Sequence, residues 1–195
     1  MVAAIDGSLG SLQIFPTDPE PSASDPALLF DRALTIRAPH LRAEPERPEH
    51  RQPLLDLTIA CSPLVALLPR AMLELQFTAQ DATFLAHRPR AMRRVVMDSN
   101  MVIGRIIVDW PDATTSHGVD IAVHPDHRTS GAGLAMLRAW LDVADADGRC
   151  CTLDVIADNP ARRIYRRLGF VEDAGEPGAP YCFMTREPRP ARLRR

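Results

Sequence analysis

A short loop with two glycines and an arginine is suited to binding a phosphate group. The loop reads Val123-His-Pro-Asp-His-Arg-Thr-Ser-Gly-Ala-Gly133, and it joins an apolar strand expected at 119–123 to an apolar helix expected to end near Asp145. The N-terminus of a helix presents unpaired N–H groups and a partial charge of roughly +0.5. Glycines let the backbone approach a phosphate because no Cβ stands in the way. These residues therefore predict a pyrophosphate site built from backbone donors.

The spacing of the glycines narrows the choice of ligand. The chain has no Gly-x-Gly-x-x-Gly followed by an acidic residue and no Gly-Lys-Ser/Thr, so neither a dinucleotide-binding fold nor a P-loop NTPase is supported. The pattern Val-x-Pro-x-x-Arg-x-x-Gly-x-Gly instead resembles the acetyl-CoA loop of the GNAT (Gcn5-related) N-acetyltransferase family. The alternative for the same residues is an ordinary turn between a strand and a helix, in which the glycines serve geometry alone.

A second motif carries the same resemblance. The stretch Asn159-Pro-Ala-Arg-Arg-Ile-Tyr165-Arg-Arg-Leu-Gly169-Phe follows a strand expected at 150–156. Asn159 suits a helix N-cap with the next proline at the first helical position, and Gly169 suits the left-handed residue after the helix. Ile164 and Leu168 are four residues apart and are expected to share one face. The stretch resembles the family's Asn…Leu-Tyr…Leu-Gly-Phe signature, with Ile164 in place of the usual leucine.

The order of elements along the chain predicts an α/β fold. Hydrophobic periodicity and turn residues give the order β-α-α-β-β-β-α-β-α-β, which predicts a mixed sheet with helices on both faces and matches the GNAT fold. The expected segments before the phosphate loop are a strand near 41–43, helices over 48–57 and 69–85, and a hairpin over 93–108. The last expected segments are the helix through Tyr165 and a strand at 181–184.

The resemblance extends over about residues 40–185. It is closest to a bacterial subgroup whose second helix carries Phe/Leu-x-x-Gln-Phe-x-Ala-Gln, which here reads Leu73-Glu-Leu-Gln76-Phe77-Thr-Ala-Gln80. No settled substrate follows from this subgroup pattern. Gln76 and Gln80 are expected either to line the acceptor groove or to lie on a solvated helix face.

Composition divides the chain into three parts. Residues 1–36 are rich in proline and are expected to be a mostly mobile extension, although the Leu28-Leu29-Phe30 patch is able to dock on the domain. Residues 37–186 are expected to form the N-acetyltransferase domain. Residues 187–195 form an Arg/Pro tail, for which a solvated end is favoured over a nucleic-acid contact.

Length and composition are typical of one enzyme-sized domain. The chain has 195 residues, is 46% hydrophobic and carries a formal net charge of −2, so neither nucleic acid nor an acidic membrane is expected as a partner. Its four cysteines lack Cys-x-x-Cys spacing, and no metal is expected. No apolar run approaches the roughly 20 residues that span a bilayer. We expect a cytoplasmic protein that is a monomer or a homodimer.

The resemblance implies where acetyl-CoA binds. In this family the donor lies where two neighbouring parallel strands splay apart, so that one strand edge pairs with the pantetheine arm and the loop takes the pyrophosphate. The arginine side chain of the loop is able to add a charge-assisted hydrogen bond. The implied contacts fall on Ile121, Ala122, Val123, Arg128, Thr129, Ser130, Gly131, Ala132, Gly133, Asn159 and Tyr165.

Tyr165 is the candidate general acid. A phenol with a pKa near 10 can protonate a thiolate whose parent thiol has a pKa near 8.5. The alternative is a helix tyrosine that packs on the sheet. The resemblance favours the acid.

The candidate general bases are His117 and Asp120. In several family members a residue of the fourth strand takes the proton of the amine, directly or through water. The two residues are an odd number apart, so they are expected to face opposite sides of the sheet, and at most one can point at the acetyl group. His117 has a suitable ordinary pKa near 6.5. Neither residue is needed as a base if a chain of water molecules carries the proton away or if the amine arrives in its neutral form.

These features predict an N-acetyltransferase. We expect it to transfer the acetyl group of acetyl-CoA to a primary amine of a small molecule or peptide by direct attack in a ternary complex. The alternative is a non-catalytic acyl-CoA-binding regulatory module of the same fold. An interaction-only protein would suit the proline-rich N-terminus but would leave the phosphate loop unexplained.

Overall fold

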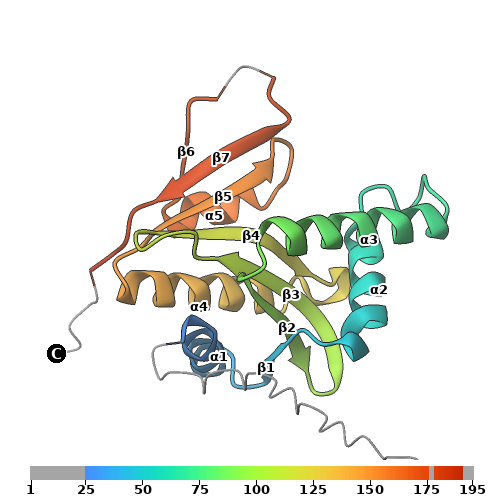
Figure 1. Ribbon diagram of the computed structural model, residues 1–195, viewed down its shortest axis with the longest axis horizontal. Helices are drawn as coiled ribbons and strands as arrows, with labels where there is room; N and C mark the ends of the chain where they lie inside the picture. Colours follow the sequence, from blue (N-terminus) through green and yellow to red (C-terminus); the bar gives the residue numbers. More distant parts are fainter. Residues whose placement is uncertain (1–24, 176–177, 191–195) are drawn as a thin grey trace, which may run out of the picture.

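A mixed β-sheet forms the centre of the molecule (Figure 1). The computed structural model describes residues 25–175 and 178–190, and within them seven strands pair in the order β1-β2-β3-β4-β5-β7-β6. Among these strands only β4 and β5 pair in parallel. The strands are β1 (Leu41–Pro45), β2 (Met92–Asp98), β3 (Met101–Asp109), β4 (Thr115–Val123), β5 (Cys150–Ile156), β6 (Val171–Glu172) and β7 (Tyr181–Arg186).

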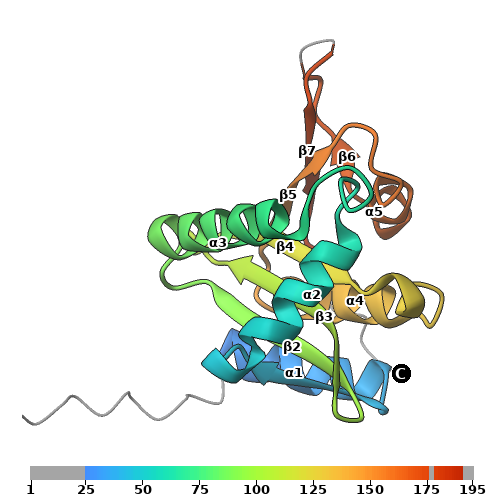
Figure 2. The ribbon, with the colours of Figure 1, turned by 90° about the vertical axis from the view of Figure 1, so that its right-hand side faces the viewer.

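Helices cover both faces of this sheet (Figure 2), as the element order predicts. Side chains of α1, α4 and α5 share one apolar core with the sheet, whereas α2 and α3 pack on the opposite face. In the described part of the chain, no helix is both long and apolar enough to cross a membrane. The helices are α1 (Pro26–Arg37), α2 (Arg51–Cys61), α3 (Arg70–His87), α4 (Ala132–Ala146) and α5 (Arg162–Leu168).

The first helix was not expected. The domain boundary predicted at residue 37 is too late, because Pro26–Arg37 forms α1 and the side chains of Phe30 and Leu34 have no exposed surface. Asp25 caps this helix by accepting a hydrogen bond from the N–H of Ala27 at 2.9 Å. The apolar patch at Phe30 therefore docks as part of the core. Residues 1–24 of the predicted extension lie outside the described residues.

The α5 segment differs in detail from its prediction. The helix begins at Arg162 rather than at the proline after Asn159, because a tighter turn precedes it in which the N–H of Arg162 donates to the carbonyl of Asn159 at 3.1 Å. The Asn159 side chain still accepts from the N–H of Ala161 at 2.9 Å. Ile164 is exposed, and Tyr165 and Leu168 form the buried face instead. Gly169 ends the helix with a φ of 100°, as predicted.

The expected C-terminal tail is partly docked. The backbone N–H of Arg189 donates to Asp145 Oδ1 at 2.8 Å, and its guanidinium donates to the carbonyl of Leu168 at 3.1 Å. The domain therefore extends past the boundary predicted at residue 186. Residues 191–195 lie outside the described residues.

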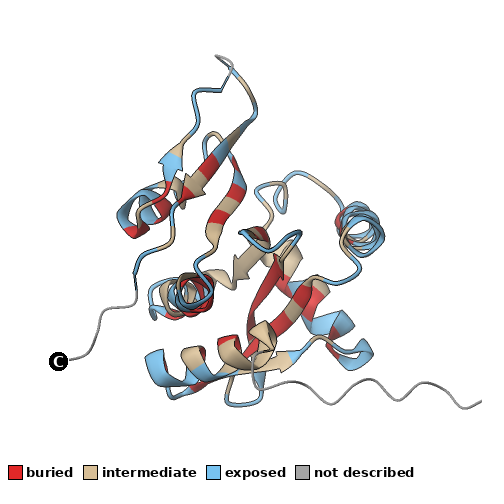
Figure 3. Cartoon of the chain, turned by 60° about the vertical axis from the view of Figure 1, so that its left-hand side comes forward, coloured by how far each residue is buried: buried red, intermediate tan, exposed pale blue. Residues whose placement is uncertain are grey.

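The indole of Trp140 fixes β4 against α4. Trp140 is fully buried, and its Nε1 donates to Ser116 Oγ on β4 at 2.7 Å. Gly118 lies against the same ring, so closely that a Cβ there would be 2.9 Å from Trp140 Cη2. Figure 3 shows the buried residues of α4 and of the central strands in red. The beginning of β4 is thus held rigidly before the strand reaches the candidate site.

Replacing the phenyl group of Phe30 tests whether α1 belongs to the core. Phe30→Ala is expected to lower the free energy of unfolding by about 3–5 kcal/mol, because it leaves a cavity in a fully buried region. Ile36→Ala on the same helix is the control; Ile36 is 76% exposed, and a change within about 0.5 kcal/mol is expected. Urea denaturation followed by circular dichroism measures both. An unchanged unfolding midpoint for Phe30→Ala would contradict the inclusion of α1.

Candidate functional site

Two parallel strands separate at the centre of the sheet. Pairing between β4 and β5 runs from Thr115 opposite Cys150 to Gly118 opposite Leu153 and ends there, although both strands continue. On the other edge of β4, the N–H of His124 donates to the carbonyl of Ile103 at 2.8 Å. Successive residues of a strand present their backbone groups to alternate edges, so the backbone groups of Ile121 and Val123 point toward the gap. The gap is therefore edged by backbone hydrogen-bonding groups.

A β-bulge lies at the same point of β4. Ile107 on β3 stands opposite Asp120, and Val108 stands opposite Gly118, so Val119 has no partner of its own. One extra residue reverses the side-chain alternation beyond it. His117 and Asp120 consequently lie on the same face of the sheet, and the expectation that they face opposite sides is wrong. The odd spacing misleads because it assumes a regular strand.

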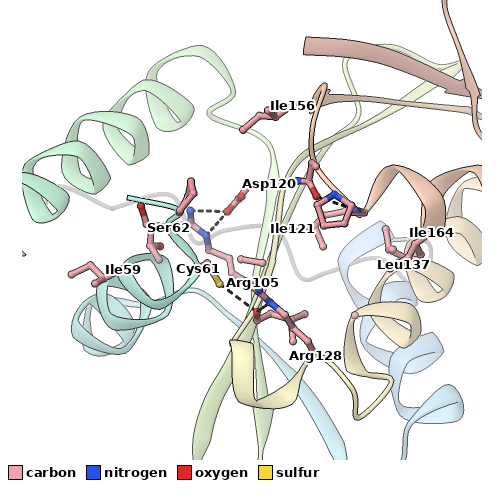
Figure 4. A pocket seen from close by; sticks show the side chains of 18 of the residues that line it. Ile59, Cys61, Ser62, Arg105, Asp120, Ile121, Arg128, Leu137, Ile156 and Ile164 are labelled. Carbon is pink, nitrogen blue, oxygen red and sulfur yellow. Dashed lines mark hydrogen bonds and ion pairs between the residues drawn. The ribbon is translucent and has the colours of Figure 1, made fainter. Parts of the chain in front are cut away.

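A pocket of about 690 Å³ opens where the strands separate (Figure 4). The sheet and helices from both of its faces contribute to the lining, which comes from α2, α3, β3, β4, α4, β5 and α5. Of the residues predicted to contact the donor, eight line this pocket and three do not. Those that line it are Ile121, Ala122, Val123, Arg128, Gly131, Gly133, Asn159 and Tyr165. Thr129 and Ser130 lie in the loop and Ala132 is the first residue of α4, but none of the three is part of the lining.

The glycine loop has the geometry of an anion cradle. Gly131 is the N-cap of α4 and has a φ of 86°, a conformation that favours glycine, and no atom lies within 4 Å of a Cβ placed there. Ser130 Oγ donates to the carbonyl of His127 at 2.7 Å and accepts from the N–H of Ala132 at 3.3 Å. The first N–H groups of α4 open onto the pocket beside Gly133. This donor set fits a pyrophosphate.

Arg128 adds positive charge at the same end of the pocket. Its side chain is exposed, and its Nε donates to the carbonyl of Val123 at 3.4 Å. The thiol of Cys61 on α2 also donates to this carbonyl at 3.3 Å. Both contacts tie the loop and α2 to the end of β4, and the guanidinium remains beside the cradle.

Tyr165 reaches the pocket from α5. The residue is only 9% exposed, and its ring packs edge-on against Phe170 with centroids 5.9 Å apart. Burial, and then the nearby Asp120 carboxylate, raise the pKa of Tyr165 to about 12. The phenol is therefore fully protonated at neutral pH and is a weaker acid than its ordinary pKa suggests.

Arg105 is a further component of the site, and it belongs to neither of the two sequence motifs. Its side chain lines the pocket although the residue is only 2% exposed, and its guanidinium lies 5.6 Å from the ring centre of Phe77. Nε and one terminal nitrogen bind the same oxygen, Asp120 Oδ2, at 2.8 and 2.7 Å. The other terminal nitrogen donates to Asp81 on α3 at 3.1 Å. Arg105 thus joins β3, β4 and α3 beneath the pocket.

The ion pairs of Arg105 continue away from the pocket. Asp81 also pairs with Arg93 on β2, and Arg93 binds Glu46 at 3.0 Å. Three carboxylates and two guanidinium groups form this chain, so one negative charge is left over. The chain of charges ends in the pocket at Asp120.

His117 lies outside the pocket lining. Its Nδ1 is 2.9 Å from Thr152 Oγ1 on β5, and its Nε2 is 4.0 Å from Asp154 Oδ2. Burial, and then the Arg88 guanidinium, lower the pKa of His117. Of the two candidate bases, Asp120 is therefore the one that faces the pocket.

The α3 wall forms the other side of the pocket. Gln76 and Gln80 both line it, together with Leu73 and Phe77 from the same helix. Both glutamines are exposed as well, so their place beside the acceptor stays a prediction. Across residues 25–175 and 178–190, no three His, Cys, Asp or Glu side chains are grouped as metal ligands would be.

Comparison with known proteins agrees with this geometry. Residues 90–172 match the family model described as "Acetyltransferase (GNAT) domain". No curated protein matches the chain significantly. Many solved structures share the fold.

Three of these structures illustrate the similarity. Ard1 from Thermoplasma volcanium is 19% identical, with a TM-score of 0.57 over 77% of this chain and 99% of Ard1. The PaiA N-acetyltransferase from Thermoplasma acidophilum, solved in complex with coenzyme A, is 11% identical, with a TM-score of 0.58 over 75% of this chain and 98% of its own. The ribosomal-protein-S18-alanine N-acetyltransferase from Escherichia coli is 17% identical, with a TM-score of 0.56 over 80% and 98%. At these identities the likeness establishes the fold.

Removing the Arg105 guanidinium tests whether the buried ion pairs hold α3 on the sheet. Arg105→Met is expected to lower the free energy of unfolding by about 3–5 kcal/mol, because Asp81 and Asp120 lose a buried partner. Arg70→Met is the matched control, since Arg70 also bridges two carboxylates, Asp56 and Glu74, but is exposed; little change is expected. Thermal denaturation compares them. Equal effects of the two substitutions would show that burial of the Arg105 pairs is unimportant.

Proposed function

We propose, from the premise that the chain belongs to the GNAT acetyltransferase family, that it transfers the acetyl group of acetyl-CoA to a primary amine of a small molecule or peptide. The observation that carries the proposal is the convergence of the strand gap, the glycine loop and Tyr165 on one pocket. Arg128 and the residues of the α3 wall line one and the same pocket. That continuity supports direct attack in a ternary complex.

The donor end is defined by backbone groups. Acetyl-CoA supplies an activated acetyl group as a thioester. The N–H groups at Gly133 and at the start of α4 are placed to bind its pyrophosphate, with Arg128 adding charge. The edge of β4 at Ile121 and Val123 is placed to pair with the pantetheine amides. Backbone donors fixed by the sheet need little reorganisation when the donor binds.

Asp120 is the residue placed to receive the amine. Both of its bonds to Arg105 use Oδ2, which leaves Oδ1 as the acceptor for an ammonium or amine N–H. Arg105 keeps the carboxylate in one orientation and ties it to α3 through Asp81. In the proposed reaction the amine proton passes to Asp120, directly or through water, and the neutral nitrogen attacks the thioester carbonyl carbon.

Tyr165 acts on the leaving sulfur. When the new C–N bond forms, the C–S bond breaks and the thiolate of CoA departs with the bonding electron pair. A phenol whose pKa is about 12 is a weaker acid by roughly three to four units than a thiol of ordinary pKa. Tyr165 therefore acts mainly by donating a hydrogen bond to the departing sulfur and less by transferring its proton completely.

Substitution of Gly131 tests the donor site. Gly131→Glu is expected to abolish acetyl-CoA binding, because a carboxylate would stand where the pyrophosphate binds. Gly148→Glu is the matched control: Gly148 also has a positive φ, of 66°, but lies at the far end of α4. Calorimetric titration of each folded variant measures the dissociation constant. Retained binding in Gly131→Glu, or an equal loss in both variants, would contradict the assignment.

Substitution of Tyr165 tests catalysis separately from binding. Tyr165→Phe keeps the ring packing on Phe170 and is expected to leave acetyl-CoA affinity unchanged while lowering kcat by roughly a hundredfold. Mass spectrometry of the acetylated amine, across a broad amine panel, provides the rate. An unchanged kcat would remove Tyr165 from the mechanism. Binding of acetyl-CoA with no acetylation of any amine would favour a non-catalytic acyl-CoA-binding module.

A further inference from the structure

In the part of the chain that the structure describes, no helix covers one apolar face of the β5–β7 pair. Leu153, Val155 and Met184 point to the core shared with α4 and α5, so the side chains between them point to the opposite side. On that side Ile156 is 50%, Tyr181 58% and Phe183 39% exposed. Figure 2 shows that these strands extend beyond α3, the helix that covers the neighbouring strands. Ile156, Tyr181 and Phe183 are called the β5–β7 face below.

The β5–β7 face is continuous with the pocket. Ile156 belongs to both, and Tyr181 stands directly opposite it in the β5–β7 register. Phe183 is opposite Asp154, two residues back along β5, which puts it within reach of the same ligand. In Figure 4, Ile156 lies at the end of the pocket away from Arg128, beyond Asp120. The face therefore borders the acceptor end.

Charge at this end favours a cation. Asp120 lies inside the pocket. The Asp154 side chain, two residues before Ile156 on β5, is on the same side of the sheet and is 56% exposed. An amine with an apolar body matches this combination, because its ammonium group faces carboxylates while its carbon skeleton covers aromatic surface.

The area of the face argues against a second protein chain as its occupant. Two aromatic residues and one isoleucine, each about half exposed, offer on the order of 300 Å² of side-chain surface. A stable interface buries roughly 800 Å² on each partner. A surface of this size matches one ring or one branched alkyl group.

We propose that the acceptor is a primary amine whose non-reacting part is an aromatic or branched apolar group, and that this group lies on the β5–β7 face while the amine nitrogen lies at Asp120. This inference rests on the proposed function, because it names the substrate class of the same pocket. It assigns Tyr181 and Phe183 as residues that determine specificity. Neither takes part in the chemistry.

Matched amines test the preference. The full chain is assayed with acetyl-CoA and 2-phenylethylamine, 3-methylbutylamine, ethylamine, ethanolamine or spermidine, and the acetylated products are quantified by mass spectrometry. The kcat/KM for 2-phenylethylamine and 3-methylbutylamine is expected to exceed that for ethylamine and ethanolamine by at least about tenfold. Calorimetric titration of the same amines into the protein with CoA bound gives the preference independently of turnover.

Substitutions on the face test its role. Phe183→Ser and Tyr181→Ser are each expected to lower the preference for 2-phenylethylamine over ethylamine by at least about fivefold, through KM and not kcat. Leu75→Ser is the matched control, because Leu75 is 71% exposed on α3 and does not line the pocket. All three residues are exposed, so the variants are expected to fold.

The outcomes separate this inference from the function on which it rests. Loss of the preference in the two β5–β7 variants, with Leu75→Ser unchanged, supports the inference. Equal or faster acetylation of ethanolamine or spermidine overturns it while the acetyltransferase function stands. Equal binding of all the amines, without acetylation of any, overturns both. A homodimer in sedimentation that Phe183→Ser dissociates also overturns it, since the face would then be occupied by a second copy.

Discussion

The site depends on the point at which β4 and β5 stop pairing. Backbone polar groups in a sheet must find partners, and beyond Gly118 those of β4 that face β5 no longer pair with that strand; the carbonyl of Val123 accepts from Cys61 and Arg128 instead. The bulge at Val119 lies at the same point and turns Asp120 to the side where α3 closes the pocket. One local irregularity thus supplies both the strand edge that we propose for the donor and the carboxylate that we propose for the acceptor. The ring of Trp140, packed on Gly118, fixes where this irregularity begins.

The charges of the site are arranged around this gap. At the donor end, Arg128 and the start of α4 present positive potential, whereas the acceptor end terminates a chain of ion pairs with one carboxylate in excess. Arg105 has two roles in this row of ion pairs: it orients Asp120, and it anchors α3 through Asp81. Under the proposed function, stability and substrate orientation would therefore depend on the same buried guanidinium.

The sequence predicts the regular parts of the fold well. Apolar alternation around the Ser99 turn defines the central hairpin, and the glycines define where the phosphate loop passes into α4. The sequence contains a helix start for α1, because Asp25 is an N-cap residue and a proline follows it. The proline-rich composition of residues 1–36 instead favours a mobile extension. Arg105 was also visible as a charge inside an apolar strand, which must find partners when buried. The bulge at Val119 cannot be predicted from the sequence, because strand register depends on contacts with β3 and α4 that no local pattern encodes.

Backbone hydrogen exchange with and without acetyl-CoA shows whether the separated edge of β4 binds the donor. If the separated edge of β4 and the glycine loop bind the donor, the amides of Ile121, Val123 and residues 131–134 become strongly protected on addition of acetyl-CoA. The amide of His124, the residue after β4, already donates to Ile103 of β3 and should change much less. Protection confined to other segments, or none at saturating acetyl-CoA, would contradict the account.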